Sequence, residues 1–472
     1  MSTPSVSYSI TVRLELPSHP TAVSTVTTVV EREGGLVTAV DVSGSELDRL
    51  QVDVTCATGG EVEAARIVDA LRELDGVKIG RVSDRVFLAH LGGKLTIESR
   101  VPIRHRDDLS LVYTPGVARV SKQIAEHPED ARRLTIKRNT IAVVSDGSAV
   151  LGLGNIGPLA ALPVMEGKSA LFKRFAGIDS FPLVLDTQDV EEIIATVRNV
   201  APVFAGINLE DISAPRCFEI EARLRAELDI PVFHDDQHGT GIVATAALIN
   251  ALVVVDKKIE DVRIVLSGAG AAGSAVLRMM IAAGARDVTV IDVDGIIHTS
   301  REGMHPSIAE IAEKTNPRGM TGKLSDAIVG ADVFVGVSAP NILTEEDVMA
   351  MAPRSIVFAL ANPVSEIDPA IAAKHAAVVA SGRSDYANQI NNVLAFPGVF
   401  RGLLDARSNK VTDDLLLAAA KALAAVVTPE ELNPTYIIPS VFHPDVHTTV
   451  ARAVQEAAEA HAARHAAKHA GD

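Results

Sequence analysis

Several features that mark particular classes of protein are scarce or missing in this sequence of 472 residues. It has only two cysteines, Cys56 and Cys217, which lie far apart, so we expect no disulfide framework and infer a reducing cytoplasm. It has no long block of lysine or arginine, and its formal net charge is -16 at pH 7. We therefore expect no nucleic acid partner, because a basic surface is what binds the phosphate backbone.

Segments that would direct the chain into a membrane are not evident either. The first ten residues lack the basic and apolar regions of a signal peptide. The apolar stretch after Gly241 is short and is interrupted by threonine and asparagine, so we do not expect it to span a bilayer. These observations predict a cytoplasmic protein with no membrane partner.

The length of the chain predicts about three domains, since a domain usually contains about 100 to 200 residues. Changes of pattern divide the sequence into residues 1–90, 91–240 and 241–472. From about 100 to 260 and from about 261 to 400, strand-like runs alternate with helix-like runs, which is typical of α/β domains with parallel sheets. An alanine-rich helix is expected at the C-terminal end.

The first ninety residues show a complete pattern of their own. Strands are expected at 8–16, 36–42, 50–56 and 78–88, and helices at 21–35 and 61–76. The order βαββαβ is that of a ferredoxin-like α+β module. It resembles the ACT family of small regulatory modules, which implies a metabolite effector near the turn at 18–23 and pairing between copies of the chain.

Two stretches match the pattern G-x-G-x-x-G, so the match alone does not show which of them binds a dinucleotide. The first, at 152–157, is followed by Pro158 and Pro163, which we expect to interrupt the helix that should present its N-terminus to a pyrophosphate. No acidic residue ends a strand at the expected distance after it.

The second stretch, at 268–273, has all parts of the dinucleotide fingerprint. A strand-like run precedes it, a helix-like run follows it, and Asp292 ends the next strand. A tight turn without a ligand is the weaker alternative. Asp292 would accept hydrogen bonds from the ribose and repel a 2′-phosphate, which favours NAD over NADP, although Arg301 downstream leaves the choice open. The expected cofactor-binding residues of this turn are Gly268, Gly270, Ala271, Ala272 and Gly273.

Two pairs of carboxylates follow two apolar strands. Glu210 and Asp211 come after one strand, and Asp235 and Asp236 come after the next. Ligands of open α/β sheets bind at such strand ends, and clustered carboxylates suit Mg²⁺ or Mn²⁺. Either pair alone would be explained by helix capping, but the two pairs together favour a metal site. His234 and His238, on either side of the second pair, are expected to pack or to support the site.

Chemistry beside a nicotinamide cofactor also needs an acid and a base. Tyr113 stands before a Pro-Gly turn, where its phenol could point into a cleft. Lys168 follows a glycine in apolar surroundings, where burial and a nearby cation would lower its pKa toward neutrality. A core tyrosine and a surface lysine are the ordinary alternatives.

Seven motifs in the same order resemble the malic enzymes, specifically the shorter bacterial type. They are YTPGVA, DGSAVLGLGNIGPLAALPVMEGKSALFKRFAGID, INLEDI, FHDDQHGT, GAGAAG, FALANP and NNVLAFPG, and the likeness runs from about Tyr113 to Asp405. The resemblance implies Tyr113 as the acid and Lys168 as the base, with Asp235 positioning the lysine. It also implies metal ligands at Glu210, Asp211 and Asp236, substrate or nicotinamide contacts at Asn362 and Asn392, and Thr240 near the cofactor.

The chain departs from the longer eukaryotic members of that family at one substrate contact. An arginine that binds malate precedes their LGLG stretch, whereas Val150 stands at that place here. Another cation must then meet the substrate carboxylate, with Lys173 and Arg174 as candidates.

The activity implied by the resemblance is the oxidative decarboxylation of (S)-malate to pyruvate and CO₂, with reduction of NAD. Lys168 would take the proton of the C2 hydroxyl, a divalent metal would stabilise the developing charge, and Tyr113 would protonate the enol. A malolactic-type enzyme and a non-catalytic nucleotide-binding sensor are the alternatives. A homodimer or higher homo-oligomer is expected.

Overall fold

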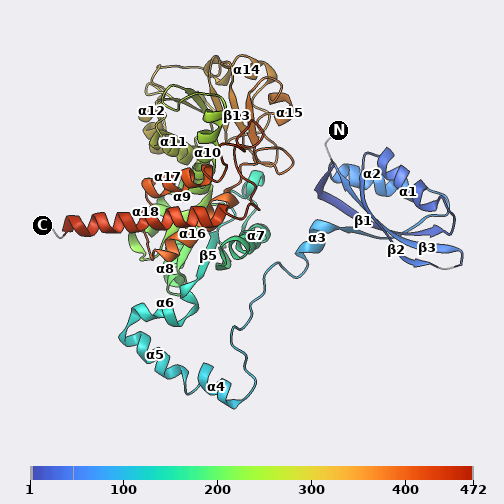
Figure 1. Cartoon of the computed structure of the whole chain (residues 1–472), viewed down its shortest axis with the longest axis horizontal. Coiled ribbons are helices and arrows are strands. Elements are labelled where there is room, and N and C mark those ends of the chain that lie inside the picture. Colours follow the sequence, from blue (N-terminus) through green and yellow to red (C-terminus); the bar gives the residue numbers. More distant parts are fainter. Residues whose placement is uncertain (1–3, 46, 470–472) are drawn as a thin grey trace. The chain divides into compact units, whose positions relative to one another are not determined.

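The computed structural model describes residues 4–45 and 47–469, and the chain forms two compact units, Met1–Thr96 and Ile97–Asp472 (Figure 1). The expected boundary at residue 90 lies near the end of the first unit. The expected boundary at residue 240 falls inside a helix of the second unit, so the two α/β domains share that helix.

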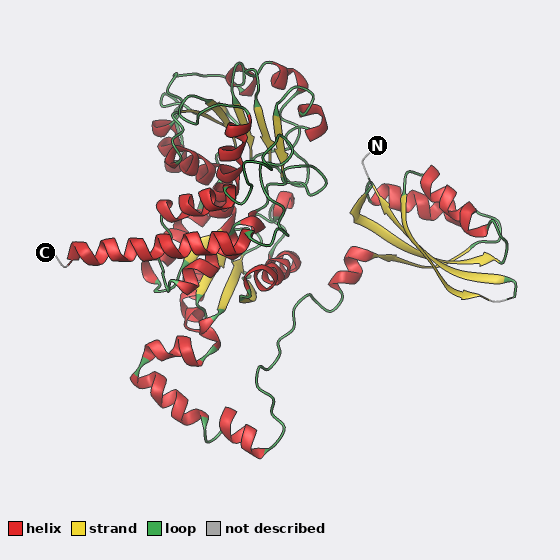
Figure 2. Ribbon diagram, viewed as in Figure 1, coloured by secondary structure: helices red, strands yellow, loops and turns green. Residues whose placement is uncertain are grey.

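The first unit has the βαββαβ order of the ferredoxin-like fold. Its antiparallel sheet has the strand order β2-β3-β1-β4, and two helices cover one face of it (Figure 2). Alternate residues of the strands, such as Leu14 and Val54, are buried beneath these helices. The elements are β1 Ser5–Pro17, α1 Ala22–Arg32, β2 Leu36–Ser45, β3 Arg49–Thr58, α2 Glu61–Arg72, β4 Lys78–Asp84 and α3 Arg85–His90.

The fourth strand is shorter than predicted. A strand over 78–88 was expected, but β4 ends at Asp84 and α3 begins at Arg85. The Asp84 carboxylate accepts hydrogen bonds from the backbone N–H groups of Val86 and Phe87, which caps the helix. The composition of residues 78–88 is typical of a strand, so the sequence pattern did not indicate that Asp84 begins a helix.

The second unit begins with an arm of short helices and continues into a parallel sheet of order β6-β5-β7-β8. The arm holds α4 Arg106–Val112, α5 Val117–Glu126 and α6 Ala131–Leu134. The strands are β5 Thr140–Ser145, β6 Asp179–Val184, β7 Gly206–Leu209 and β8 Val232–His234, and the helices are α7 Pro158–Ala176, α8 Val190–Val200, α9 Arg216–Glu227 and α10 Asp235–Val254.

A proline-containing helix follows the first glycine-rich stretch, contrary to the prediction. The helix α7 begins at Pro158 and continues through Pro163 to Ala176. Proline is favoured at the first helical position, because its missing N–H would have no partner there. Ala161 and Met165, which flank Pro163, are buried in the core and keep α7 helical there, and the helix carries Lys168 near its middle.

The second sheet has the strand order of the Rossmann fold, β11-β10-β9-β12-β13-β14, with only β11 antiparallel. The prediction of α/β domains with parallel sheets is thus confirmed. The strands are β9 Arg263–Ser267, β10 Asp287–Asp292, β11 Gly295–Ile296, β12 Val333–Gly336, β13 Ile356–Ala359 and β14 Val378–Ser381. The helices are α11 Ala271–Ala282, α12 Pro306–Lys314, α13 Leu324–Ala327, α14 Glu345–Met349 and α15 Pro369–Ala372.

Three helices complete the unit, α16 Phe396–Asp405, α17 Asp413–Ala424 and α18 Val446–His469, and α18 contacts both of the others. Among the residues that the structure describes, one helix, α10, is long and apolar enough to cross a membrane, but 78% of its apolar window is buried inside the protein. It also begins with two aspartates. We therefore assign α10 as a core helix that joins the two sheets.

Candidate active site

Four carboxylates gather at the carboxyl ends of β7 and β8. Glu210 and Asp211 follow β7, and Asp235 and Asp236 open α10 directly after β8. One oxygen each of Glu210, Asp211 and Asp236 lie within 4.8 Å of one another. The backbone N–H of Asp211 donates to the Asp236 carboxylate at 2.8 Å. Because neighbouring parallel strands end at one edge, the two pairs predicted to meet do so.

The side chain of Lys168 reaches this group from α7. Its Nζ lies 2.6 Å from Asp235 Oδ2 and 2.9 Å from Glu210 Oε1. It also lies 4.2 Å from the centre of the Phe396 ring, a cation–π contact. The lysine side chain is almost buried, so the alternative of a surface lysine does not apply.

The charges at the site shift the ionisation of its members. Burial lowers the pKa of Lys168, but Asp235 and Glu210 outweigh burial and raise that pKa above its ordinary value. The expected lowering is therefore not found for the chain alone, because its anions dominate. Burial, and then the charge of Asp236, raise the pKa of Asp211 to about 8. Burial also raises the pKa of Glu210.

The carboxylates of Glu210, Asp211 and Asp236 fit a divalent cation. They are close enough to share one ion, they are oxygen ligands, and Asp211 Oδ2 is a buried atom with no hydrogen-bond partner. The charge of Asp236 helps to raise the pKa values of Glu210 and Asp211, and a cation would relieve this repulsion. Asp211 also adopts a φ of 54°, a left-handed conformation that is costly and concentrates at functional sites.

The glycines of HGTG make room for the site. A Cβ at Gly239 would lie 2.0 Å from Asp235 Oδ1, so a side chain there would displace the aspartate. A Cβ at Gly241 would lie 3.0 Å from the side chain of Met279, where α11 approaches α10. The motif therefore allows the first turn of α10 to hold a carboxylate against its own backbone.

Asn392 and Thr240 join the same site. The Asn392 side chain donates to Asp235 Oδ2 at 3.1 Å and accepts from the Thr240 hydroxyl at 3.2 Å. Asn392 lies in a short 3-10 turn after β14, so the segment that follows the second sheet reaches the start of α10.

Asn362 is enclosed by two glycines from separate segments. A Cβ at Gly152 would lie 2.1 Å from the Asn362 carbonyl oxygen, and one at Gly382 would lie 2.6 Å from its Nδ2. Gly152 belongs to the first G-x-G-x-x-G stretch. That stretch therefore permits a close approach to the loop after β13, which supports the view that it is not the dinucleotide turn.

The second glycine stretch has the geometry of a dinucleotide turn. Gly268 has a φ of 113°, and a Cβ at Gly273 would lie 1.9 Å from the Gly268 carbonyl oxygen. A Cβ at Gly270 would meet nothing within 4 Å, so the backbone there is open to a ligand. Ala271 and Ala272 begin α11, whose N-terminus suits a pyrophosphate.

Asp292 ends β10 as expected, but it is held by Arg301. Arg301 Nη1 donates to Asp292 Oδ1 at 2.9 Å and to Oδ2 at 3.0 Å, and Nη2 lies 2.6 Å from Asp294 Oδ2. Asp292, which is expected to bind the ribose, and Arg301, which could bind a 2′-phosphate, are thus partners in one ion pair.

The structure does not bring Tyr113 to the other site residues. Tyr113 caps the C-terminus of α4, and it is 63% exposed and does not point into a cleft as expected. Figure 1 shows α4 apart from α7 and α10 within the second unit. The two candidates for the substrate cation have partners elsewhere: Lys173 pairs with Asp179, and Arg174 lies over the Phe175 ring.

Sequence reasoning missed two residues of the site. Phe396, in the quoted motif NNVLAFPG, contacts the Lys168 ammonium. Glu221 on α9 is buried and accepts hydrogen bonds from residues on both sides of Asp235 and Asp236. A glutamate in the middle of a helix is a weak sequence signal, so only its position reveals its role.

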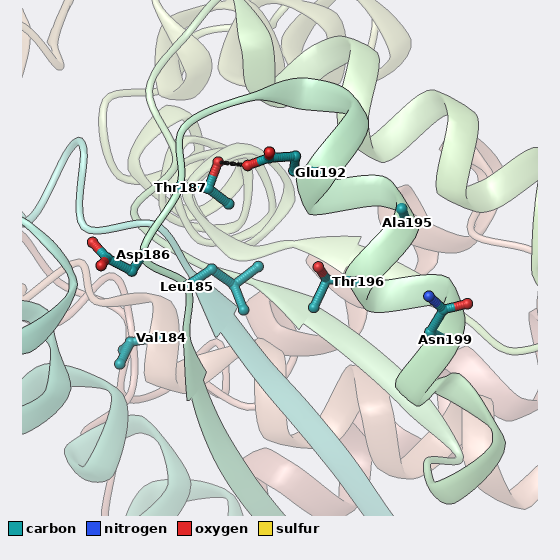
Figure 3. Close-up of a pocket in the computed structure, with 8 residues that line it drawn as sticks. All are labelled: Val184, Leu185, Asp186, Thr187, Glu192, Ala195, Thr196 and Asn199. Atoms are coloured by element: carbon teal, nitrogen blue, oxygen red, sulfur yellow. Dashed lines mark hydrogen bonds between the residues drawn. The ribbon is translucent and has the colours of Figure 1, made fainter.

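Two pockets lie away from the acidic cluster. One, of about 450 Å³, lies between the end of β6 and α8, and Figure 3 shows the hydrogen bond from Thr187 to Glu192 among the residues that line it. The other, of about 530 Å³, lies between α9, α11 and α12 and includes Glu221 and Gln237 in its wall.

Fold and site together define a class of protein. A Rossmann sheet with a dinucleotide turn adjoins a second α/β sheet, where three clustered carboxylates follow the strand ends and a buried lysine of α7 reaches them. This combination defines a dinucleotide-dependent dehydrogenase with a site for a divalent cation.

Two family models match the second unit. Residues 93–225 match the malic enzyme N-terminal domain, and residues 237–459 match the malic enzyme NAD binding domain. The chain therefore belongs to the malic enzyme family, which catalyses the oxidative decarboxylation of malate with a nicotinamide cofactor and a divalent metal ion. The predicted family, activity class and cofactors are thus confirmed.

Individual relatives agree with the family assignment. An NAD-dependent malic enzyme of Geobacillus stearothermophilus is 56% identical over 444 residues, which cover 94% of this chain and 93% of the relative. This alignment is longer than the second unit, so the similarity extends into the first. A bifunctional malic/malolactic enzyme of Bacillus subtilis is 51% identical, covering 76% of this chain and 88% of the relative.

Solved structures show the same fold. The crystal structure of an NAD-dependent malic enzyme from Thermotoga maritima is 48% identical, with a TM-score of 0.76, and covers 79% of this chain and 99% of that chain. A malic enzyme of Entamoeba histolytica, 37% identical, also has a TM-score of 0.76 and covers 79% of this chain and 80% of that chain.

Proposed function

We propose that Lys168 is the general base of malate oxidation and that Glu210, Asp211 and Asp236 hold the divalent cation. The observation that carries this proposal is the contact of Lys168 Nζ with both Asp235 and Glu210 beside the three clustered carboxylates. When bound, Mg²⁺ or Mn²⁺ supplies a Lewis acid for the oxygens of the substrate and stabilises negative charge that develops on them.

The protein's own residues then perform the proton transfers. Lys168 accepts the proton of the C2 hydroxyl while hydride passes to NAD. A lysine must be neutral to accept a proton, whereas Asp235 and Glu210 both favour its charged form. A cation bound to Glu210 would offset the charge of that glutamate and so favour the neutral lysine. Asp235 and the Phe396 ring orient the ammonium group, and Asn362 and Asn392 contact the substrate carboxylates or the nicotinamide.

Tyr113 is proposed as the acid that protonates C3 of the enol after CO₂ has left. Tyr113 is exposed on the arm, so it can act in an active site only if another part of the protein packs against the arm. The arm exposes further apolar side chains, including Ile103, Leu109 and Leu111. A second copy of the chain that buries this surface and receives Tyr113 accounts for both facts, so we propose a homodimer or a higher homo-oligomer.

The nucleotide is proposed to bind at the turn of Gly268, Gly270 and Gly273, with Thr240 near the nicotinamide end. Asp292 is proposed to accept hydrogen bonds from the ribose, which favours NAD. We also propose a cytoplasmic location, because Cys56 and Cys217 lie far apart in the sequence and both are free thiols.

The first unit is proposed as a regulatory module of the ACT type. It has the complete ferredoxin-like fold and its own core, whereas all the proposed site residues lie in the second unit. The effector is proposed to bind near the turn at 18–23, where His19 Nδ1 contacts Thr21 Oγ1.

Malolactic conversion of malate to lactate is the second candidate, favoured by the similarity to the bifunctional enzyme of Bacillus subtilis. Product analysis separates the two. Incubation with (S)-malate, NAD and Mn²⁺ should release pyruvate, CO₂ and free NADH in equal amounts. Lactate without free NADH would establish the malolactic reaction instead.

A further inference from the structure

A buried carboxylate on α9 connects that helix to the corner between β8 and α10. Glu221 Oε1 accepts the backbone N–H of His234 at 3.1 Å and His238 Nε2 at 2.7 Å. Glu221 Oε2 accepts Gln237 Nε2 at 3.2 Å, and Arg225 Nη2 lies 3.0 Å from Oε1. The three donors from the corner therefore lie on both sides of Asp235 and Asp236.

The charge on Glu221 makes this connection strong. Burial acts to raise the pKa of Glu221, but His238, Arg225 and His234 outweigh burial and lower it below its ordinary range. At neutral pH the ionised Glu221 carboxylate has no proton to donate and acts as an acceptor. His238 therefore carries a proton on Nε2, the ring nitrogen that contacts Glu221. Bonds to an ionised acceptor are shorter and stronger than neutral ones, and here they hold the backbone as well as two side chains.

The carboxylates of the corner have partners at one oxygen each, since Asp235 Oδ2 contacts Lys168 and Asn392 and Asp236 Oδ2 accepts from the backbone N–H of Asp211. Asp235 Oδ1 is buried without a hydrogen-bond partner, and Asp236 is 31% exposed. A shift of the corner by a fraction of an ångström would change the distances from Asp235 to Lys168 and from Asp236 to Asp211. Partners of ligating groups commonly set metal affinity in this way.

We propose that Glu221 is a positioning residue, which holds the β8–α10 corner so that Asp236 faces the cation site and Asp235 faces Lys168. This inference rests on the proposed metal ligands. It adds a residue that contacts neither the cation nor the substrate, and it assigns a purpose to His238 and Gln237 in the motif FHDDQHGT.

The test is a titration of the purified full-length protein with Mn²⁺ alone, followed by calorimetry or by electron paramagnetic resonance of the free ion. Glu221→Gln keeps the size of the side chain and removes its charge. We expect a rise of about tenfold in the Mn²⁺ dissociation constant with unchanged affinity for NAD. In the assay, KM for malate should rise while KM for NAD should not, a difference that general loss of stability would not produce.

The matched control is Glu219→Gln, on the same helix, where an exposed carboxylate pairs with Arg223 at the surface. It should bind Mn²⁺ as the wild type does. Unchanged Mn²⁺ affinity in folded Glu221→Gln would overturn the inference. If Glu221→Gln does not fold, Gln237→Leu removes one donor only, and an unchanged Mn²⁺ affinity in that variant would overturn it.

Asp236→Asn in the same titration separates the inference from the proposed function. Weakened binding in both Asp236→Asn and Glu221→Gln supports both. Weakened binding in Asp236→Asn alone leaves the metal site in place and refutes the role of Glu221. Normal binding in Asp236→Asn refutes the metal ligands themselves.

Discussion

Lys168 Nζ lies 2.6 Å from Asp235 Oδ2, although the two residues are 67 positions apart and belong to different helices. The contact joins α7 to the first turn of α10, and it makes the lysine part of the acidic site. Lys168→Met should reduce malate oxidation about a hundredfold or more, because it removes the proposed acceptor of the hydroxyl proton. NAD and Mn²⁺ affinities, measured by calorimetry, should remain. A Lys168→Met protein that oxidises malate at a near-normal rate would remove the lysine from the chemistry.

Tyr113→Phe should impair protonation of the enol more than hydride transfer. The comparison is between malate oxidation and oxaloacetate reduction, which needs no enol protonation. Equal losses in both reactions would contradict the proposed role of the phenol.

If Tyr113 of one chain acts in the active site of a second copy, two inactive variants should complement each other. Co-expression of Tyr113→Phe and Lys168→Met chains creates mixed dimers with one intact site, so about a quarter of wild-type activity should return if the two chains pair at random. If Tyr113 acts within its own chain, each site in a mixed dimer has one defect and the mixture stays as inactive as its parts.

Cofactor choice should depend on the ion pair of Asp292 with Arg301. The wild type should prefer NAD, and more efficient reduction of NADP than of NAD would refute this. Asp292→Ser removes repulsion of the 2′-phosphate and frees the guanidinium group to bind it, so kcat/KM for NADP should rise. Asp292→Ser combined with Arg301→Ala should lose most of that rise. A double variant that uses NADP as well as Asp292→Ser does would exclude Arg301 from the effect.

Removal of the first unit should leave catalysis intact and abolish metabolite regulation. A chain that starts at Gly92 keeps every proposed site residue, and the malic enzyme family match begins at residue 93. An effector acts only through a difference in its affinity for the active and inactive states, so the shortened enzyme should show one rate with and without amino acids or other metabolites. A shortened chain that folds and binds NAD and Mn²⁺ without turnover would place the first unit in the catalytic machinery.

Much of the site could be predicted from local sequence because it lies where strands end. Glu210, Asp211, Asp235 and Asp236 each follow an apolar run, and the rules of parallel sheets bring such positions to one edge. The dinucleotide turn was predictable from local sequence too, since Gly268 and Gly273 avoid clashes that a side chain would cause within one βαβ unit and Gly270 leaves the backbone open.

Other features depend on contacts that local pattern does not contain. The helix through Pro163 exists because packing outweighs the cost of proline, and Glu221 gains its role from partners in another element. The place of Tyr113 depends on a long arm with few contacts of its own. Arg301 was noticed in the sequence, but its pairing with Asp292 requires the turn between them.

The central claim is that three carboxylates at two strand ends hold the cation that malate oxidation requires. The direct measurement is the rate of NADH formation from malate by protein stripped of divalent ions and returned to low Mn²⁺, for the wild type and for Asp236→Asn. The wild type should recover its full rate. Asp236→Asn, which keeps the fold but loses the charge that holds a hard cation, should not recover although it still binds NAD. A near-normal rate for Asp236→Asn at low Mn²⁺ would contradict the claim.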